Sequence, residues 1–467
     1  MGAALKFGTS GWRAVLAEEF TFDNARRVVA SIADHLLEKG IAGQGVVVGS
    51  DTRFLGERFR KDAAAVLSSR GVPVWLLSRD VPTPVLSFEI RRLGAAGGIN
   101  FTASHNPPEY QGLKFSTADG APALPDVTAD IERRIAETPP GSVLPEKSRS
   151  EIRSSDPRDP YLDSILSRVD RDVIRAARLR IAVDPRFGTS RGYLDEALRR
   201  AGCEVVTIHD TADPTFGGTS PQCDARNLLV MRQLVRRQKL SFGLATDGDA
   251  DRFAVVDPSG RYVTPNLVLG LLAASLAGAA PQGTGIARSV ATTHLLDAVA
   301  ASAGRPLLET PVGFKYIGEL LLAGKIFFGG EESAGLTIGG HLPEKDGILA
   351  GVLVAELIAI RQLPPDALVR EMFRTLGVRL TRRLDLRLDA QIMARVRLRV
   401  ASPPDSIGGR KVARTVTIDG MKAIFEDDSW CLVRLSGTEP VARLYVEARS
   451  PGALHALARD ARRWLLG

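Results

Sequence analysis

The chain has 467 residues, 44% of them apolar and 25% charged, with a formal net charge of +7. One hydrophobic core rarely organises more than about 300 residues, so this length predicts three or four domains, and the composition excludes wholesale disorder and collagen-like repetition. The most apolar runs, 267–280 and 348–360, are shorter than the roughly 20 residues of a membrane span, and the N-terminus carries no export or lipidation signal.

Cysteine usage and charge indicate the compartment and the kind of partner. Cys203, Cys223 and Cys431 form no CxxC pair and cannot build a disulfide framework, so we expect a reducing, cytoplasmic location. The basic residues are scattered and only 6% of residues are aromatic, which disfavours a nucleic-acid partner. We expect an anionic small substrate, no nucleic acid and no membrane, and the sequence favours neither a monomer nor a dimer.

Three apolar, β-branched runs end in an acidic residue and a turn, at 46–53, 180–188 and 242–252, and each precedes a helix-like stretch. This alternation predicts βαβ units with buried parallel strands, and ligands bind at the carboxyl ends of such strands. The recurrence suggests similar α/β domains in tandem. Linker-like composition at 138–160, near 258–265 and at 364–365 indicates where they end.

The pattern changes after about residue 375, where apolar and polar residues alternate at 383–389 and 395–400. Strict alternation predicts half-buried antiparallel strands, so the C-terminal domain should be α+β. Arg395, Arg397 and Arg399 would then share one strand face, for which a solvated surface is favoured over a nucleic-acid platform.

The motif FTASHNPP at 101–108 follows an apolar, glycine-rich stretch. The Asn106-Pro107 step enforces a turn that can present the Ser104 hydroxyl to a cleft as a nucleophile. No G-x-S-x-G elbow surrounds the serine, which disfavours an α/β-hydrolase triad. Taken alone, the motif fits an ordinary turn with an exposed serine better.

The motif ATDGDADR places Asp247, Asp249 and Asp251 directly after an apolar run. Carboxylates at i, i+2 and i+4 can converge on one point, and a divalent cation such as Mg²⁺ offsets the cost of gathering their charge. An EF-hand is excluded because Arg252 and Pro258 stand where that loop needs Gly and Glu. The alternative is an acidic turn between strands.

Two later segments offer polar groups that suit sugar hydroxyls and phosphate, respectively. Glu331 and Ser333 in GGEESAG, followed by HLPEKDG, can grip vicinal hydroxyls from one loop. In the segment 433–448, Arg434 and Arg443 flank Ser436, Gly437 and Thr438, and this arrangement predicts a phosphate cradle that is also compatible with a hairpin. The chain contains no Walker A motif and no strand-linked GxGxxG.

Together, FGTSGWR, TASHNP, DGDADR, GEES and RLSGTEP resemble the α-D-phosphohexomutases, a family that includes phosphoglucomutase and phosphomannomutase, in order and spacing along almost the whole chain. The resemblance implies three similar tandem α/β domains plus a C-terminal α+β domain around a central cleft. The expected domains are 1–150 with a phosphoserine loop, 151–257 with a metal loop, 258–372 with a sugar-binding loop and 373–467 with a phosphate-binding loop.

The resemblance also implies roles for individual residues. Ser104 is similar to the serine that carries a phosphoryl group and, with Asp247, Asp249 and Asp251, binds Mg²⁺. Arg252 is similar to an arginine that stabilises phosphoryl transfer. The remaining matches are Glu331 and Ser333 for sugar hydroxyls, Arg434, Ser436, Gly437, Thr438 and Arg443 for the non-reacting phosphate, Lys114 and Lys345 near the reacting sugar, and Arg13 and His105 with less defined roles.

The implied activity is reversible phosphoryl transfer between the 1- and 6-positions of a hexose phosphate, with glucose 1,6-bisphosphate as activator. Lys114, His105 and Lys345 are the candidate general bases. The loop GEESAG is closer to those of glucose-handling members than to the GEMSGH or GEQSGH loops of dual-specificity and glucosamine members, and Gly335 stands where those loops have a final His. We therefore expect activity on glucose first, mannose second and glucosamine last. The competing hypotheses are a sugar phosphatase and a sugar-phosphate sensor without turnover.

Overall fold

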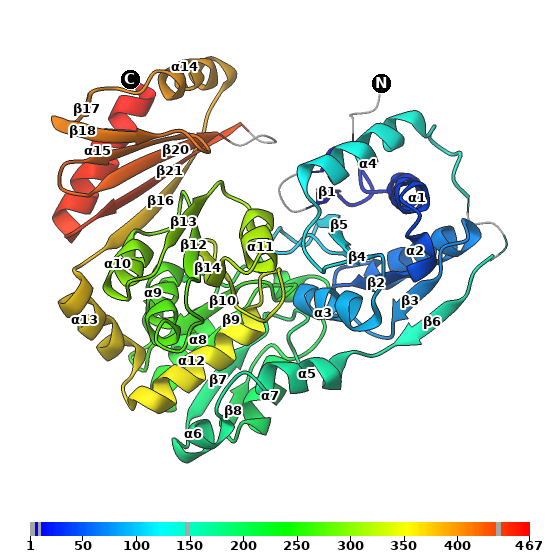
Figure 1. The fold of residues 1–467 in the computed structure, drawn as a ribbon, viewed down its shortest axis with the longest axis horizontal. Coiled ribbons are helices and arrows are strands. Elements are labelled where there is room, and N and C mark those ends of the chain that lie inside the picture. The colour runs from blue at the N-terminus through cyan, green and yellow to red at the C-terminus, as the bar shows by residue number, and fades with distance from the viewer. Residues whose placement is uncertain (1–4, 8–10, 145–146, 148, 436–439) are drawn as a thin grey trace.

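The computed structural model describes residues 5–7, 11–144, 147, 149–435 and 440–467, which form four β-sheets flanked by helices (Figure 1). In the first sheet, of order β1-β5-β4-β2-β3-β6, the last four strands are parallel, whereas β5 runs antiparallel to β4 and β1. Its strands are β1 (Trp12–Val15), β2 (Val46–Ser50), β3 (Val74–Leu77), β4 (Gly97–Phe101), β5 (Tyr110–Thr117) and β6 (Ile152–Ser155), and its helices are α1 (Phe22–Glu38), α2 (Gly56–Ser69), α3 (Thr83–Leu93) and α4 (Pro125–Glu137). This sheet includes β6 and therefore extends past residue 150, where the first domain was expected to end.

The second sheet has the order β11-β10-β9-β7-β8, with β7, β8 and β9 parallel and β10 antiparallel to β9. Its strands are β7 (Arg180–Asp184), β8 (Glu204–Thr207), β9 (Phe242–Thr246), β10 (Phe253–Val256) and β11 (Tyr262–Val263), and its helices are α5 (Arg158–Leu166), α6 (Arg171–Ala176), α7 (Leu194–Arg200) and α8 (Leu229–Arg237). The strands predicted at 46–53, 180–188 and 242–252 are confirmed. The helix expected after 242–252 is wrong, because β9 returns at once as the antiparallel strand β10.

The third sheet has the order β13-β12-β14-β15, and again its last strand, β15, runs antiparallel to its neighbour. Its strands are β12 (Gly285–Ser289), β13 (Leu307–Thr310), β14 (Ile326–Glu331) and β15 (Gly335–Ile338), and its helices are α9 (Pro265–Leu276), α10 (Leu295–Ser302), α11 (Phe314–Leu322), α12 (Gly347–Arg361) and α13 (Pro365–Leu376). The first three sheets thus share one device, a parallel strand that turns directly into an antiparallel one.

The C-terminal sheet is antiparallel throughout, with the order β16-β21-β20-β19-β18-β17. Its strands are β16 (Leu380–Arg387), β17 (Ser406–Ile407), β18 (Arg410–Val416), β19 (Met421–Phe425), β20 (Trp430–Leu435) and β21 (Val441–Ala448), and its helices are α14 (Ala390–Ala401) and α15 (Pro451–Leu466). The strand predicted at 383–389 is confirmed as β16, and the α+β class of this domain is confirmed.

The strand predicted at 395–400 is wrong, because this segment belongs to helix α14. The Asp389 side chain caps the helix by accepting a hydrogen bond from the Ile392 N–H. Met393 and Val396 are buried at helical spacing, whereas Leu398, which alternation would have buried, is exposed. Arg395 and Arg397 are exposed on this helix, not on a strand face.

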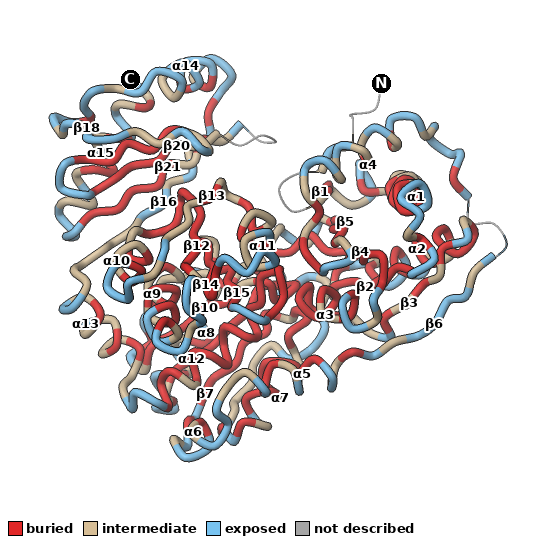
Figure 2. Tube along the Cα trace, in the orientation of Figure 1, coloured by how far each residue is buried: buried red, intermediate tan, exposed pale blue. Residues whose placement is uncertain are grey.

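A shared cluster of buried side chains joins the first three domains, whereas the C-terminal domain has a separate core. The shared cluster runs from α3 through α5 and α7 to α9 and α12. The rest of the first domain has a core of its own, between its sheet and α1, α2 and α4. Figure 2 colours the buried residues red. The C-terminal domain has its own core between its sheet and α14 and α15. It meets the third domain through a smaller apolar contact in which Val290 and Ala291 pack against Trp430 and Tyr445.

Among the described residues, no single helix is long and apolar enough to cross a membrane. The pair α12 and α13 passes that test only when taken together, and the two helices are bent by 76° at their junction. Most of α12 is buried in the shared core.

Candidate active site

Each shared strand-to-strand connection carries one of the motifs singled out from the sequence. The segment between β4 and β5 contains Ser104, the segment between β9 and β10 contains the three aspartates, and the segment between β14 and β15 contains Ser333. The antiparallel strands β20 and β21 lead into and out of the fourth motif, whose Ser436, Gly437 and Thr438 lie outside the described residues.

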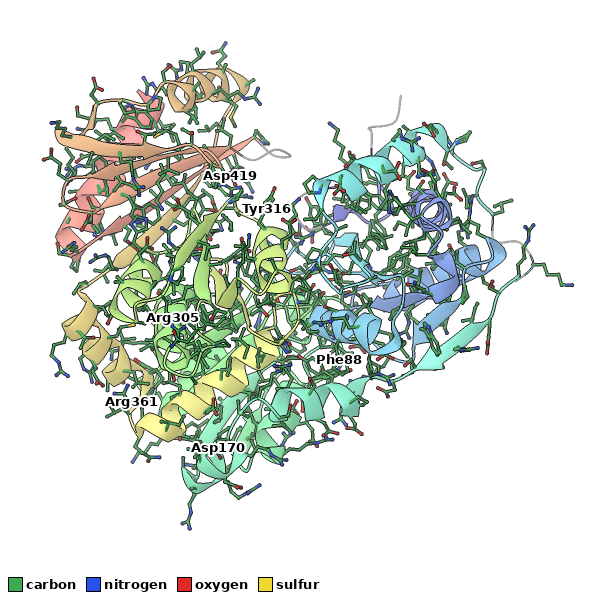
Figure 3. All side chains as sticks on the ribbon, in the orientation of Figure 1. Phe88, Asp170, Arg305, Tyr316, Arg361 and Asp419 are labelled. Atoms are coloured by element: carbon green, nitrogen blue, oxygen red, sulfur yellow. The ribbon has the colours of Figure 1, made fainter. Side chains whose placement is uncertain are left out.

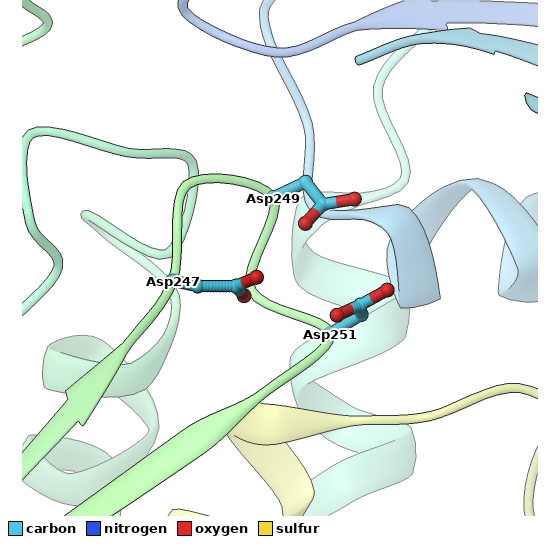
Figure 4. Close-up of side chains that lie close together, drawn as sticks. All are labelled: Asp247, Asp249 and Asp251. Atoms are coloured by element: carbon cyan, nitrogen blue, oxygen red, sulfur yellow. The ribbon is translucent and has the colours of Figure 1, made fainter. Parts of the chain in front are cut away.

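The three aspartates converge as predicted (Figure 4). Asp247, Asp249 and Asp251 each offer a carboxylate oxygen, and these oxygens lie within 4.8 Å of one another in a buried position. Ala250 has φ 58°, in the left-handed region, and this tight turn lets alternate residues face one point. Burial raises the pKa of Asp247 to about 8, and the charges of Asp251 and Asp249 add to this shift. Three negative charges at this place are therefore unfavourable.

The donor set fits a hard divalent cation such as Mg²⁺. All three ligands are carboxylates, and Asp249 Oδ1 and Asp251 Oδ1 are buried without a hydrogen-bond partner among the described residues. Buried acceptors of this kind are costly unless a cation or donor satisfies them.

Ser104 meets this cluster from the first domain. Its hydroxyl donates a hydrogen bond of 3.0 Å to Asp247 Oδ2, and its side chain is almost fully buried. The residue has φ 51°, a conformation that is uncommon for a residue with a side chain and that often marks functional sites. The nearest ring nitrogen of His105, Nδ1, lies 3.4 Å from the hydroxyl oxygen.

Basic side chains surround the carboxylates. Lys114 on β5 donates to Asp249 at 2.6 Å and to Asp251 at 2.9 Å, and Lys345 lies 3.2 Å from Asp251. The Arg252 Nε atom lies 3.7 Å from Asp251 Oδ1. Arg13 donates to Asn106 Oδ1 at 2.8 Å and thereby contacts the serine loop. A pocket between the first and third domains is bordered by both lysines, Phe314 and Glu344.

The three candidate bases differ in charge. Burial alone would lower the pKa of Lys114, but Asp249 and Asp251 outweigh it and raise that pKa. Burial also lowers the pKa of Lys345, but the charges of Asp251 and Glu344 outweigh it and raise that pKa above its usual value. Burial holds the pKa of His105 well below its usual range, and the positive charges of Arg252 and Arg13 lower it further. The directions of these shifts favour a neutral imidazole at His105 and ammonium groups at both lysines.

The loop that contains Glu331 and Ser333 is held from two sides. Glu331 Oε1 accepts a hydrogen bond of 2.8 Å from the Gly313 N–H at the start of α11. A side chain at Gly335 would place its Cβ 2.2 Å from Lys345 Cδ, so the absence of a side chain there lets the lysine stem lie across the loop. Ser333 is half-buried in the turn that follows Glu331.

Arg434 and Arg443 lie directly opposite each other on β20 and β21. Two guanidinium groups on neighbouring strands suit an anion such as phosphate. Arg434 pairs with Asp419 at 2.7 Å.

Two positioning residues escaped the sequence interpretation. Buried Arg53 donates to the backbone oxygens of Ser104, Asn106, Pro107 and Tyr110, and so fixes the serine loop. Thr83 donates to Asp249 Oδ2 at 2.6 Å from the start of α3. Arg53 ends the noted run 46–53, but nothing in that run reveals which carbonyls its side chain meets.

Comparison with known proteins identifies the chain. Models of alpha/beta/alpha domains I, II and III and of the C-terminal domain of phosphoglucomutase/phosphomannomutase match residues 4–140, 159–260, 264–376 and 393–463. A phosphoglucomutase/phosphomannomutase of Thermococcus kodakarensis is 31% identical, with 95% of this chain and 94% of the relative covered. A phosphoglucosamine mutase of Thermobifida fusca is 31% identical, with 97% and 96% covered. The crystal structure of a Thermus thermophilus protein assigned as a phosphomannomutase covers 100% of both chains, with 35% identity and a TM-score of 0.87.

Four domains of these types in this order define a phosphohexomutase, an isomerase that acts on sugar phosphates. The chain belongs to the phosphoglucomutase/phosphomannomutase family, the α-D-phosphohexomutases.

Proposed function

We propose that this phosphohexomutase interconverts glucose 1-phosphate and glucose 6-phosphate through a phosphoserine at Ser104 and a bound glucose 1,6-bisphosphate. The observation that carries the proposal is the 3.0 Å hydrogen bond from the Ser104 hydroxyl to Asp247 inside the carboxylate cluster. A nucleophilic oxygen at a cation site is what phosphoryl transfer requires.

The 1- and 6-positions lie on opposite sides of a hexose, so a two-step exchange solves the problem of reach. In the first step the phosphoryl group on Ser104 Oγ passes to the 6-hydroxyl of glucose 1-phosphate, whose proton leaves to a base and is returned to Ser104 Oγ. The bisphosphate then reorients in the site, its 1-phosphoryl group passes to Ser104 Oγ, and the proton of that hydroxyl passes through the base to the 1-oxygen, which releases glucose 6-phosphate. Added glucose 1,6-bisphosphate restores the phosphoserine and acts as activator.

The residues divide this work between two anion sites. Asp247, Asp249, Asp251 and the phosphoserine would hold Mg²⁺, which neutralises the charge of the group in transfer. Lys114, Lys345 and Arg252 orient the reacting phosphate, whereas Arg434 and Arg443 on another domain hold the phosphate that does not react. Glu331 and Ser333 bind sugar hydroxyls between these two sites.

The burial of Ser104 supports transfer over hydrolysis. Its side chain lies between the first and second domains, where a bound hexose would exclude water, and a site that excludes water favours the sugar hydroxyl as the acceptor. The same feature disfavours the sugar phosphatase. The presence of both the carboxylate cluster and the serine disfavours a sensor that has lost turnover.

Glucose is the proposed principal sugar, on the evidence of the loop GEESAG. Glu331 and Ser333 hold the hexose without choosing the configuration at C2, and a tolerant pocket discriminates one hydroxyl weakly. We propose lower activity on mannose 1-phosphate and little on glucosamine 1-phosphate.

One assay separates these functions. The protein is given each of the three sugar 1-phosphates, with and without glucose 1,6-bisphosphate, and both the 6-phosphate and free phosphate are measured. A mutase forms the 6-phosphate, a phosphatase releases free phosphate, and a sensor does neither. The largest kcat/KM for mannose or glucosamine would contradict the sugar preference and leave the mutase chemistry standing.

A further inference from the structure

Asp419 lies between the C-terminal and third domains, in the turn that joins β18 to β19, and Figure 3 labels it at the end of the C-terminal sheet that faces α11. A single oxygen, Oδ2, accepts two hydrogen bonds. One comes from Arg434 Nη2 at 2.7 Å and the other from the Val312 N–H, in the third domain, at 3.0 Å.

The next amide along the chain, that of Gly313, binds the loop that contains Glu331. Gly313 N–H donates to Glu331 Oε1 at 2.8 Å, so two successive amides at the start of α11 bind carboxylates from different domains. The N-terminus of a helix favours negative charge, which supports both contacts. Gly313 has φ 137°, a conformation that favours glycine.

The turn also fits Arg434 sterically. Gly420 has φ 89°, and a Cβ there would lie 2.3 Å from the Val433 carbonyl oxygen and 2.9 Å from Arg434 Cγ. Asp419 therefore holds the guanidinium while Gly420 packs against the stem of the same side chain. Arg434 Nε is buried and has no hydrogen-bond partner among the described residues, so the group keeps a donor for an anion.

We infer that Asp419 is a positioning residue that sets Arg434 at a fixed place relative to Glu331, through the 312–313 peptide, so that one hexose phosphate reaches both groups. This inference rests on the proposed function, which gives Arg434 the non-reacting phosphate and Glu331 the sugar hydroxyls. The chain of contacts runs from Arg434 to Asp419, then to the two amides, then to Glu331. A ligand that carries both a sugar and a phosphate binds more tightly because of this spacing, whereas the affinity for inorganic phosphate does not depend on it.

The test compares the full-length protein with Asp419→Ala and Asp419→Asn. Titration calorimetry with glucose 6-phosphate should show Kd raised about tenfold by Asp419→Ala, because a charge-assisted hydrogen bond is lost, and less by Asp419→Asn, whose amide oxygen still accepts from Val312. KM for glucose 1-phosphate should rise in parallel, while kcat stays within about twofold because the reacting centre is untouched. The Kd of inorganic phosphate should change less than that of glucose 6-phosphate.

Asp428→Asn is the matched control. Asp428 pairs with Arg449 at 2.6 Å on an exposed part of the same domain, and its loss should leave Kd and KM unchanged. Hydrogen exchange gives a readout that does not depend on ligand. In Asp419→Ala the amides of Val312 and Gly313 should exchange faster, while those of β19 and β20 keep their protection because the domain stays folded.

The outcomes separate the inference from the proposed function. Equal Kd values for wild type and Asp419→Ala, a loss confined to kcat, or unchanged exchange at Val312 overturns the role of Asp419. A wild-type protein that binds glucose 6-phosphate but isomerises no sugar phosphate overturns the proposed function alone. A wild-type protein that does neither overturns both.

Discussion

The Ser104 hydroxyl donates to Asp247 across 143 positions of sequence, and the two residues follow strands of different sheets. Because neither domain alone holds both groups, the proposed reacting centre exists only where the first two domains meet. Lys114 repeats this arrangement, since it reaches Asp249 and Asp251 from the first sheet.

The first prediction concerns the state of the purified protein. A substantial fraction should carry one phosphate, on Ser104, because its hydroxyl, the proposed nucleophile, lies at the carboxylate cluster. Peptide mass spectrometry locates the phosphate, and Ser104→Ala should lower kcat by at least about a thousandfold. The exposed Ser142→Ala serves as the control. Phosphate found elsewhere, with full activity of Ser104→Ala, would contradict the assignment.

Removal of the cation site should abolish transfer without unfolding the protein. Asp249→Asn, or EDTA, removes a ligand or the ion, whereas the amide oxygen of Asn can still accept from Lys114 and Thr83. We expect Tm to change by no more than about 5 °C and activity to fall by at least about a hundredfold. Asp159→Asn, at an exposed ion pair, should change neither. If calorimetry shows a domain unfolding and activity is indifferent to Mg²⁺, the carboxylates are structural.

Arg53→Lys should damage both stability and turnover. Lysine keeps the charge but cannot reach four backbone oxygens and Asp51 at once, so buried acceptors lose their donors. The free energy of unfolding should fall by about 3 kcal/mol, and kcat should fall more than KM changes, because Ser104 loses its fixed position. Denaturant titration and steady-state kinetics measure the two effects. Exposed Arg58→Lys is the control, and equal behaviour of the two variants would refute the role of Arg53.

Glu331 should give activity a pH dependence near neutrality. Burial, then the charge of Glu332, raises the pKa of Glu331 from 4.5 to about 7. As the pH falls from 8 to 6 the carboxylate should take up a proton and become a weaker acceptor for the hydroxyls of the proposed sugar substrate, so kcat/KM should fall. Its contribution to stability has the opposite sign, since it is fully present below the unfolded pKa of 4.5 and is lost as the pH rises through about 7.

The matched variant for this profile is Glu331→Gln, which cannot titrate. The substrate phosphate ionises in the same range, and that part of the profile is common to both proteins. Only the difference between the two profiles belongs to Glu331. Superimposable profiles after scaling would show that its ionisation does not matter.

Gly335→Ala tests the packing of the lysine stem against the sugar loop. The added methyl group would lie 2.2 Å from Lys345 Cδ, so the stem must move and its ammonium group leaves its place beside Asp251. We expect kcat/KM to fall by about tenfold to a hundredfold, as for a misplaced catalytic group. Gly278→Ala, where an added Cβ meets nothing, should be neutral. An unchanged kcat/KM would show that Lys345 tolerates displacement.

The sequence predicted the parts of the site that are local in the chain. The aspartates at alternate positions after an apolar strand had to share a turn, and their convergence followed from spacing alone. Arg434 and Arg443 faced each other because a hairpin pairs its strands. The resemblance supplied the order of the domains, which strand patterns suggested only weakly.

The residues that escaped prediction act across domains. Arg53, Thr83 and Asp419 contact groups 51, 166 and 107 positions away, and no local pattern encodes such pairs. The strand prediction for 395–400 was wrong for another reason. The residues of this segment satisfy both an alternating and a helical pattern. The cap at Asp389 and the apolar residues upstream of the segment favour the helix.

The separate core of the C-terminal domain has a consequence for how the enzyme fails on heating. A unit joined to the rest by a small apolar contact and a few hydrogen bonds, such as that from the Val312 N–H to Asp419, can detach at a temperature at which the cluster that joins the other three domains persists. Sugar phosphate turnover would cease at this partial opening, while circular dichroism would still register most of the helices and the intact carboxylate turn would still bind cation. Inactivation should therefore precede the main calorimetric transition, and sugar phosphate, which bridges the two parts, should bring the two temperatures together.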